Sequence, residues 1–169
     1  MEVTEQDFSS DFLERFGEKE KQYILDFCNT FLKTFPNVLD KEELISRLSR
    51  IRKLEAKEQI RAREITGETV YNDMSISYLP NQSKRDERNS IYHELFHVLS
   101  YRRNIRNMFY QRGLYDDEIK FENETSDNWY SESEAFDEIM NEYYTVKMLE
   151  CEGRFFEGEY EVEARNKVD

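Results

Sequence analysis

The chain has 169 residues, enough for a hydrophobic core, and we expect residues 1–169 to form a single domain. Asp and Glu number 37 against 24 Lys and Arg, and the resulting net charge of −13 argues against binding to a nucleic-acid backbone. No stretch approaches a membrane span and residues 1–5 lead into no apolar run, so the sequence predicts a cytoplasmic protein without a membrane partner. Secretion as part of a larger parent stays open as an alternative.

Helix-forming patterns occupy the first third of the chain. Thr4 and Asp7 can cap a first helix, whose phenylalanines recur one turn apart. A second helix is predicted over residues 18–34, where apolar residues return at helical spacing and Pro36 stops the helix. Asp40 begins a third helix, because aspartate is a favoured N-cap residue and good helix formers follow it. These helices are expected to contribute to the core.

Residues 60–79 change character, because β-branched and aromatic residues become frequent there. Apolar and polar residues alternate over residues 74–79, which is typical of a strand with one buried face, and Pro80 blocks its continuation. The sequence therefore predicts a small twisted β-sheet whose last strand is residues 74–79. Helices before and after this sheet make the expected fold class α+β.

A further helix is predicted from about residue 84 to residue 101, a stretch without Gly or Pro. Ser83 and Asp86 form a capping signal, and an apolar stripe follows at helical spacing. This helix carries His93, Glu94 and His97 in an H-E-x-x-H pattern, and its two histidines are the only ones in the chain. Residues four apart share a helix face, so both imidazoles can reach one metal ion.

The chemistry of this pattern is that of a zinc hydrolase. Two neutral imidazoles, from His93 and His97, would hold the metal, and the Glu94 carboxylate would take a proton from a metal-bound water. The alternative is a chance match between two ordinary helix histidines. We favour the metal site, because the chain contains no other histidine from which the spacing could arise at random.

The pattern resembles that of the zincin metallopeptidases, which carry H-E-x-x-H on a helix. Ser100 and Arg103 stand where the metzincin branch has a glycine and a third histidine, so the resemblance is to the gluzincin branch of thermolysin-like enzymes. Residues 137–143, D-E-I-M-N-E-Y, look similar to the segment that carries the third ligand of that branch. The resemblance implies a zincin-like fold, one Zn²⁺ per chain and a peptide or protein substrate.

By the same resemblance, Glu138 is the third metal ligand and Glu142 is the acidic residue that hydrogen-bonds a ligand histidine. Without the resemblance, the residues themselves support these two roles less specifically. Residues 131–150 are predicted as a helix that begins with a capping box of Ser131 and Glu134, and Glu134, Glu138 and Glu142 share one face. Glu134 is an alternative ligand, because the Glu-Ala-Phe run that it starts is similar to that of ImmA/IrrE-like zincins. A solvated acidic face without a metal is the other alternative.

In zincins the strand before the motif helix lies at the edge of the sheet and pairs with an extended substrate. By resemblance, the predicted substrate-binding edge strand consists of Ser75, Ile76, Ser77 and Tyr78. An edge without a ligand role is the alternative. Residues 103–130 are long, polar and irregular, with a short helix expected near residues 104–111, and would form one wall of the cleft.

Thermolysin-like enzymes use a further histidine to stabilise the tetrahedral oxyanion, and this chain has none left for that role. Tyr143, Tyr144 or an arginine from residues 102–112 would have to serve, and the sequence does not choose among them. Cys28 and Cys151 are isolated and lack metal-type spacing, so we expect neither a disulfide nor a thiolate ligand.

The sequence thus predicts a zinc metallopeptidase, with a zincin-like regulatory or partner-binding domain as the alternative. In that alternative the metal would be structural or absent, or the chain would cleave or bind one transcription factor as ImmA/IrrE-like regulators do. Such regulators usually come with a DNA-binding helix-turn-helix, and the sequence shows no convincing one.

Overall fold

The computed structural model describes residues 2–104, 109–112, 115–116 and 127–153. For residues 85, 102–104, 109–112, 115–116 and 127–137 it describes the backbone alone. Helices and two small three-stranded sheets make the fold α+β, as the sequence predicts. Among the described residues, no helix is both long enough and apolar enough to cross a membrane.

The N-terminal part is helical. Its elements are the 3₁₀ turn η1 (Glu5–Asp7) and the helices α1 (Ser10–Leu13), α2 (Glu18–Thr34) and α3 (Lys41–Leu48). The single first helix expected from the sequence is divided in two, because Ser9 caps the chain again by accepting a hydrogen bond from the Phe12 N–H. The second and third helices are confirmed, and Asp40 caps α3 by accepting a hydrogen bond from the Glu43 N–H at 2.8 Å.

Three short strands form the first sheet. They are β1 (Lys53–Ala56), β2 (Gly67–Val70) and β3 (Ser75–Tyr78), and the 3₁₀ helix η2 (Glu58–Arg63) lies between β1 and β2. The strand order is β1-β3-β2, with β3 parallel to β1 and antiparallel to β2. The prediction that Ser75, Ile76, Ser77 and Tyr78 form an edge strand is therefore wrong. Both backbone edges of β3 are paired, and all four of its side chains are buried.

The two faces of this sheet differ in polarity, which is typical of a sheet packed on one side only. Ile76 and Thr69 lie side by side in register on the face covered by α4 (Lys84–Ser100). On the opposite face Ser77 lies between Glu55 and Glu68, two long side chains that form ion pairs with lysine or arginine. Ser77 is buried, although polar, because these longer neighbours flank it.

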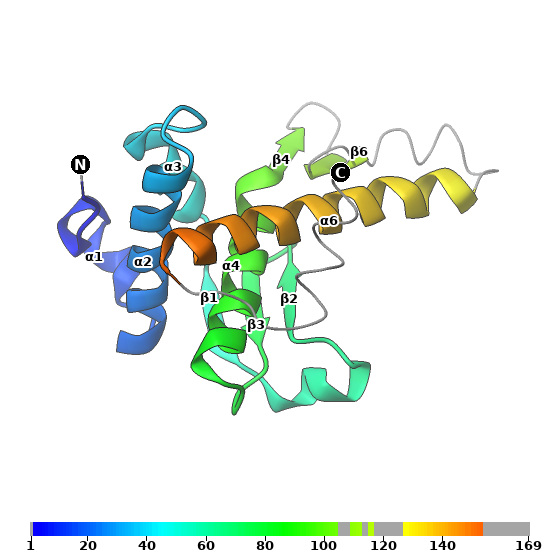
Figure 1. The fold of residues 1–169 in the computed structure, drawn as a ribbon, viewed down its shortest axis with the longest axis horizontal. Coiled ribbons are helices and arrows are strands. Elements are labelled where there is room, and N and C mark those ends of the chain that lie inside the picture. Colours follow the sequence, from blue (N-terminus) through cyan, green and yellow to red (C-terminus); the bar gives the residue numbers. More distant parts are fainter. Residues whose placement is uncertain (1, 105–108, 113–114, 117–126, 154–169) are drawn as a thin grey trace.

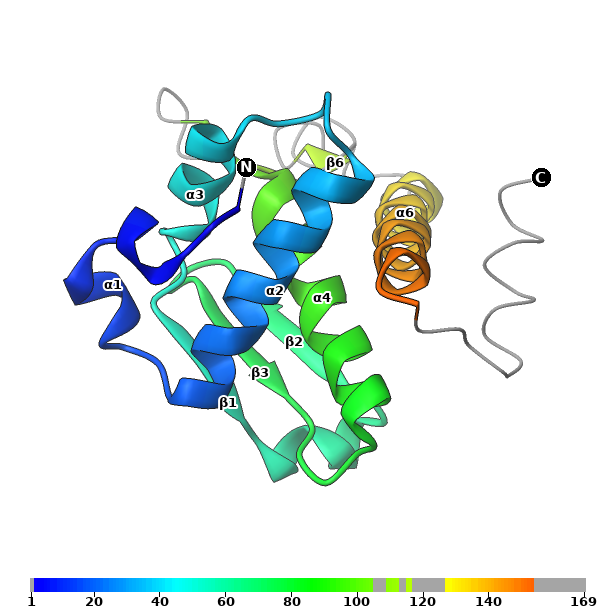
Figure 2. The same cartoon turned by 60° about the vertical axis from the view of Figure 1, so that its left-hand side comes forward.

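Helix α4 is the predicted helix that carries the H-E-x-x-H pattern. Ser83 is its N-cap residue, and the Ser83 hydroxyl accepts a hydrogen bond from the Asp86 N–H. The next long helix, α6 (Asp127–Cys151), crosses α4 and also packs against α2, as Figures 1 and 2 show. Helix α6 begins before the predicted start at Ser131, because residues 127–130 contain no Gly or Pro that would interrupt it. The crossing places residues of α6 opposite the histidines of α4.

A second sheet follows α4 without an intervening loop. Its strands are β4 (Tyr101–Asn104), β5 (Phe109–Arg112) and β6 (Tyr115–Asp116), all antiparallel in the order β4-β5-β6. The short helix expected near residues 104–111 is therefore wrong. Pairing in register between β4 and β5 uses the backbone groups that a helix would need, so strand pairing overrides the local helix propensity.

Candidate metal centre

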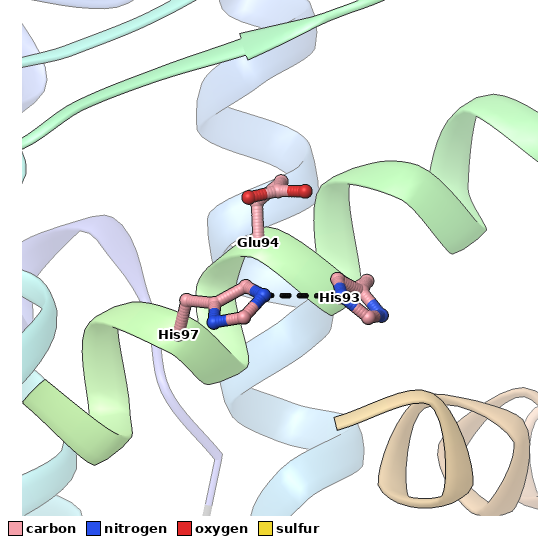
Figure 3. Close-up of side chains that lie close together, drawn as sticks. All are labelled: His93, Glu94 and His97. Atoms are coloured by element: carbon pink, nitrogen blue, oxygen red, sulfur yellow. Dashed lines mark hydrogen bonds between the residues drawn. The ribbon is translucent and has the colours of Figure 1, made fainter. Parts of the chain in front are cut away.

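His93 and His97 lie on one face of α4, one turn apart, because the motif spacing matches the helical repeat. Their Nε2 atoms are 3.1 Å apart, and Figure 3 shows the two imidazoles facing each other. The His97 side chain is nearly buried and that of His93 is 16% exposed. Both rings are thus held by the packing around α4 with their Nε2 atoms aimed at one point.

Helix α6 brings a carboxylate to this point. The two oxygens of Glu138 lie 2.9 Å from the Nε2 atom of His93 and 3.2 Å from the Nε2 atom of His97. The Glu138 side chain is half exposed (51%), so the cluster is open to solvent on this side. Two imidazole nitrogens and the two oxygens of one carboxylate therefore converge from two helices, with separations between 2.9 and 3.2 Å.

These separations fit one tetrahedral cation. Zinc bonds to nitrogen and oxygen of about 2.0–2.1 Å imply ligand atoms about 3.3 Å apart at tetrahedral angles. The donor set of two imidazoles and one carboxylate is that of catalytic zinc sites with an open fourth position. His93, His97 and Glu138 therefore fit Zn²⁺ by chemistry and by spacing.

The second nitrogens of both rings also have partners on α6. Glu142 Oε2 lies 3.2 Å from His93 Nδ1, and Asn141 Nδ2 lies 3.0 Å from His97 Nδ1. An imidazole that binds metal through Nε2 carries its proton on Nδ1 and needs an acceptor there. The Glu142 carboxylate is such an acceptor, and a half-turn of the Asn141 amide presents its Oδ1 atom to His97 in the same way.

The electrostatics of the cluster favour positive charge. Burial alone would lower the pKa of His93, but hydrogen bonds with Glu138 and Glu142 raise it to about 10. Burial likewise opposes ionisation of Glu138, yet the two histidines hold its pKa below its usual range. The two carboxylates thus create a site that attracts positive charge.

Glu94 points to another side of α4 (Figure 3). One of its carboxylate oxygens lies within 4.8 Å of imidazole nitrogens of His93 and His97, so these three residues could also hold an ion. The Glu94 side chain instead accepts a hydrogen bond from the Thr69 hydroxyl at 2.7 Å, whereas Glu138 directs both oxygens at the Nε2 atoms. The Glu138 carboxylate therefore faces the two Nε2 atoms more directly than the Glu94 carboxylate does. Burial raises the pKa of Glu94 against the opposing effect of the histidines.

Several predicted residues lie away from the cluster. Tyr78 of the predicted edge strand donates a hydrogen bond to Glu20, on the α2 side of the sheet. Tyr144 packs against Phe35 and Phe96, on the side of α4 that faces α2, and its neighbour Tyr143 contacts Tyr144 and Lys147. The side chain of Glu134 and those of the arginines among residues 102–112 lie outside the described residues.

The sequence reasoning missed four residues that touch the cluster. Asn141 and Thr69 make the hydrogen bonds given above, Gly67 adjoins the Glu94 carboxylate, and the Tyr71 ring lies 6.4 Å from the His97 ring. The helical spacing of Asn141 relative to Glu138 is a signal that would have found it. Residues 67–71 carry no such signal, because only the folded sheet brings them to α4.

Comparisons of the chain with known protein families, with curated proteins and with solved structures found no match. The geometry of the cluster is therefore what supports an assignment of function.

Proposed function

We propose that this chain is a zinc-dependent metallopeptidase of the zincin type. His93, His97 and Glu138 hold one Zn²⁺. Glu94 is the general base that activates a water molecule for hydrolysis of a peptide bond. The observation that carries the proposal is the convergence of two imidazole nitrogens and one carboxylate within 2.9–3.2 Å, beside an additional buried carboxylate.

Zinc, when bound, would polarise a carbonyl oxygen and lower the pKa of a water toward neutrality. Glu94 lies within 4.8 Å of the ligand nitrogens, close enough to share one water with the site. Its carboxylate takes the proton of that water and delivers it to the nitrogen of the leaving amine. Its burial favours this role, because a raised pKa makes the carboxylate a stronger base.

Glu142 and Asn141 orient the ligands in this scheme. Each faces the Nδ1 atom of one histidine and fixes the ring whose Nε2 atom must present a lone pair. Their position on α6 beside Glu138 means that one helix supplies the third ligand and both orienting groups. The geometry of the metal site therefore depends on how α6 docks on α4.

The substrate we propose is an extended, cationic peptide. Among the described strands β2 pairs only with β3, so its other edge can pair with an added strand. Strand β2 contacts α4 and carries Thr69, the partner of Glu94, so a peptide on this edge would lie beside the general base. The net charge of −13 favours basic substrates.

A metal-binding regulatory or partner-binding module is the second candidate. Glu94 favours it in one respect, because its side chain is only 6% exposed and already accepts a hydrogen bond from Thr69. A carboxylate held in this way could support a structural metal site without hydrolysis.

The deciding experiment measures metal content and peptide cleavage on the same preparations. We expect about one zinc per chain, cleavage within a library of basic peptides, and loss of cleavage after chelation. Glu94→Gln should keep the zinc and abolish cleavage. Zinc without cleavage in the wild type would favour the binding module, and cleavage by Glu94→Gln would contradict the assigned base.

A further inference from the structure

We infer that strand β2 positions the general base: the Thr69 hydroxyl holds the Glu94 carboxylate, and Gly67 provides the space for it. Thr69 thereby keeps Glu94 available as a base and prevents it from becoming a metal ligand. This inference rests on the proposed function, and it assigns to Thr69 a role in positioning, since its contact is with Glu94.

The contact between Thr69 and Glu94 is short and well placed. The Thr69 Oγ1 atom lies 2.7 Å from Glu94 Oε2 and 3.3 Å from the main-chain oxygen of the same residue. A hydroxyl has one proton to donate. Of the two oxygens, the carboxylate Oε2 is the closer and the stronger acceptor, so it receives the hydrogen bond. The register of β2 with β3 places Thr69 opposite Ile76, on the face that α4 covers, so the hydroxyl is fixed by the sheet.

Gly67 makes the contact possible from two residues away on the same face of β2. A Cβ atom at position 67 would lie 2.6 Å from Glu94 Oε1 and 2.8 Å from Glu94 Cγ. Both separations are shorter than carbon contacts allow, and the Glu94 side chain is buried with little room to yield. Strand β2 therefore binds one oxygen of the carboxylate by a hydrogen bond and leaves space for the other, because residue 67 has no side chain.

Release of this carboxylate would change its chemistry. Glu94 already lies within 4.8 Å of the ligand nitrogens, and rotation of a glutamate side chain can span that distance. A freed carboxylate would be drawn onto a cation bound by His93 and His97, where it would occupy the position that water needs. The hydrogen bond from Thr69 opposes this movement.

The test compares Thr69→Val, which keeps the shape and removes the hydroxyl, with Thr69→Ser, which keeps the hydroxyl. Thr30→Val is the matched control, because Thr30 also donates a hydrogen bond to a partly buried carboxylate, that of Glu152, away from the histidines. Kinetics are measured on a quenched fluorescent peptide that the wild type cleaves, and zinc affinity by competition with a chromophoric chelator.

We expect Thr69→Val to lower kcat by about 10- to 100-fold with KM nearly unchanged and to bind zinc about tenfold more tightly. Thr69→Ser should restore most of the activity, and Thr30→Val should change neither quantity. The tighter binding should disappear in Thr69→Val combined with Glu94→Gln. Wild-type kcat in Thr69→Val, or equal loss in Thr69→Ser, would overturn the inference.

A second measurement separates this inference from the proposed function. A double-mutant cycle on unfolding of the metal-free protein, with Thr69→Val and Glu94→Leu, reports the contact without hydrolysis or zinc, because leucine has no acceptor for the Thr69 hydroxyl. We expect a coupling of about fivefold or more in the unfolding equilibrium constant. Additive effects would overturn the inference even for an active enzyme, whereas coupling in a chain that cleaves nothing would leave the contact established and remove only the proposed reaction.

Discussion

Helix α4 carries two polar clusters, which differ in how their charges are balanced. Both clusters use residues four apart on α4, Arg88 with Tyr92 and His93 with His97. Each also contacts a glutamate from the region of α6: Glu152, just after the helix, in the first cluster and Glu138, in the helix, in the second. The first cluster contains a permanent cation. In the second, carboxylates surround imidazoles, and among the described residues positive charge comes from protonation of these imidazoles.

The Arg88 cluster contains one guanidinium beside two carboxylates. Arg88 lies 2.7 Å from Asp26 Oδ2 and 3.3 Å from Glu152 Oε1, and it donates a hydrogen bond to the Tyr92 hydroxyl. Tyr92 and Thr30 each donate a hydrogen bond to Glu152 at 2.7 Å. This cluster joins α2, α4 and the end of α6, and its role is to hold these helices together.

Among the side chains that the structure describes, the histidine cluster has no such permanent cation. The imidazoles of His93 and His97 face the Glu138 carboxylate. The pKa of His93 is raised because Glu138 and Glu142 form hydrogen bonds with its ring. A polar cluster whose described groups include no permanent cation is the better candidate for binding a cation. The largest effect is expected when the carboxylate of Glu138 is removed from the histidine cluster. The smallest is expected when the hydroxyl of Thr30 is removed from the Arg88 cluster.

The largest effect is expected from Glu138→Ala. Removal of a ligand should weaken zinc binding by more than about 100-fold, since loss of an orienting group alone costs about 10- to 100-fold. Glu134→Ala is the matched control and should keep about one zinc per chain. Zinc content after dialysis measures both. Normal zinc in Glu138→Ala together with loss in Glu134→Ala would reverse the ligand assignment.

Arg88→Met tests the other cluster. Loss of the guanidinium leaves the carboxylates of Asp26 and Glu152 partly buried without a cation, and breaking such a pair costs about 3–5 kcal/mol. Urea unfolding should show this loss of stability, while the folded variant still binds zinc with wild-type affinity. Weakened zinc binding in the folded fraction would mean that the two clusters are not independent.

Asn141→Leu should act on the metal site with an intermediate effect. The variant removes the partner of His97 Nδ1 and is expected to lower zinc affinity by about tenfold. Asn141→Asp provides an acceptor at the same place and should retain or improve the affinity. Chelator competition measures both variants, and equal losses in the two would contradict a hydrogen-bonding role for Asn141.

Thr30→Val is the smallest change. It removes one hydrogen bond to Glu152, which keeps its contacts with Arg88 and Tyr92, so we expect a loss of about 1 kcal/mol in unfolding free energy. Zinc affinity and activity should be unchanged. A thermal or urea unfolding curve detects the difference, and an effect on zinc would show that the Arg88 cluster also shapes the metal centre.

Local signals predicted the helices well. Helix α2 ends at Thr34, two residues before Pro36, and α3 begins directly after Asp40. Caps and prolines act on their neighbours in the sequence, so these ends could be predicted. The histidine pair follows from the helical repeat alone. Such features depend on residues a few positions apart, and the sequence displays them directly.

Contacts between distant segments were harder to predict. Alternation over residues 74–79 indicates a strand but not its place in the sheet, and burial of Ser77 depends on Glu55 and Glu68 from the neighbouring strands. Thr69 meets Glu94 across 25 residues, a separation that no local pattern reports. The same limit explains why β4 and β5 were mistaken for part of a helix.

The crossing of α6 over α4 has a consequence for how the chain folds. His93 and Glu138 are 45 residues apart, so an ion bound by both would act as a cross-link that closes a long loop. An ion of this kind binds the folded arrangement and stabilises it through its binding free energy. Removal of the metal would then weaken the docking of α6 on α4, which the buried apolar residues of α6 would still hold in part.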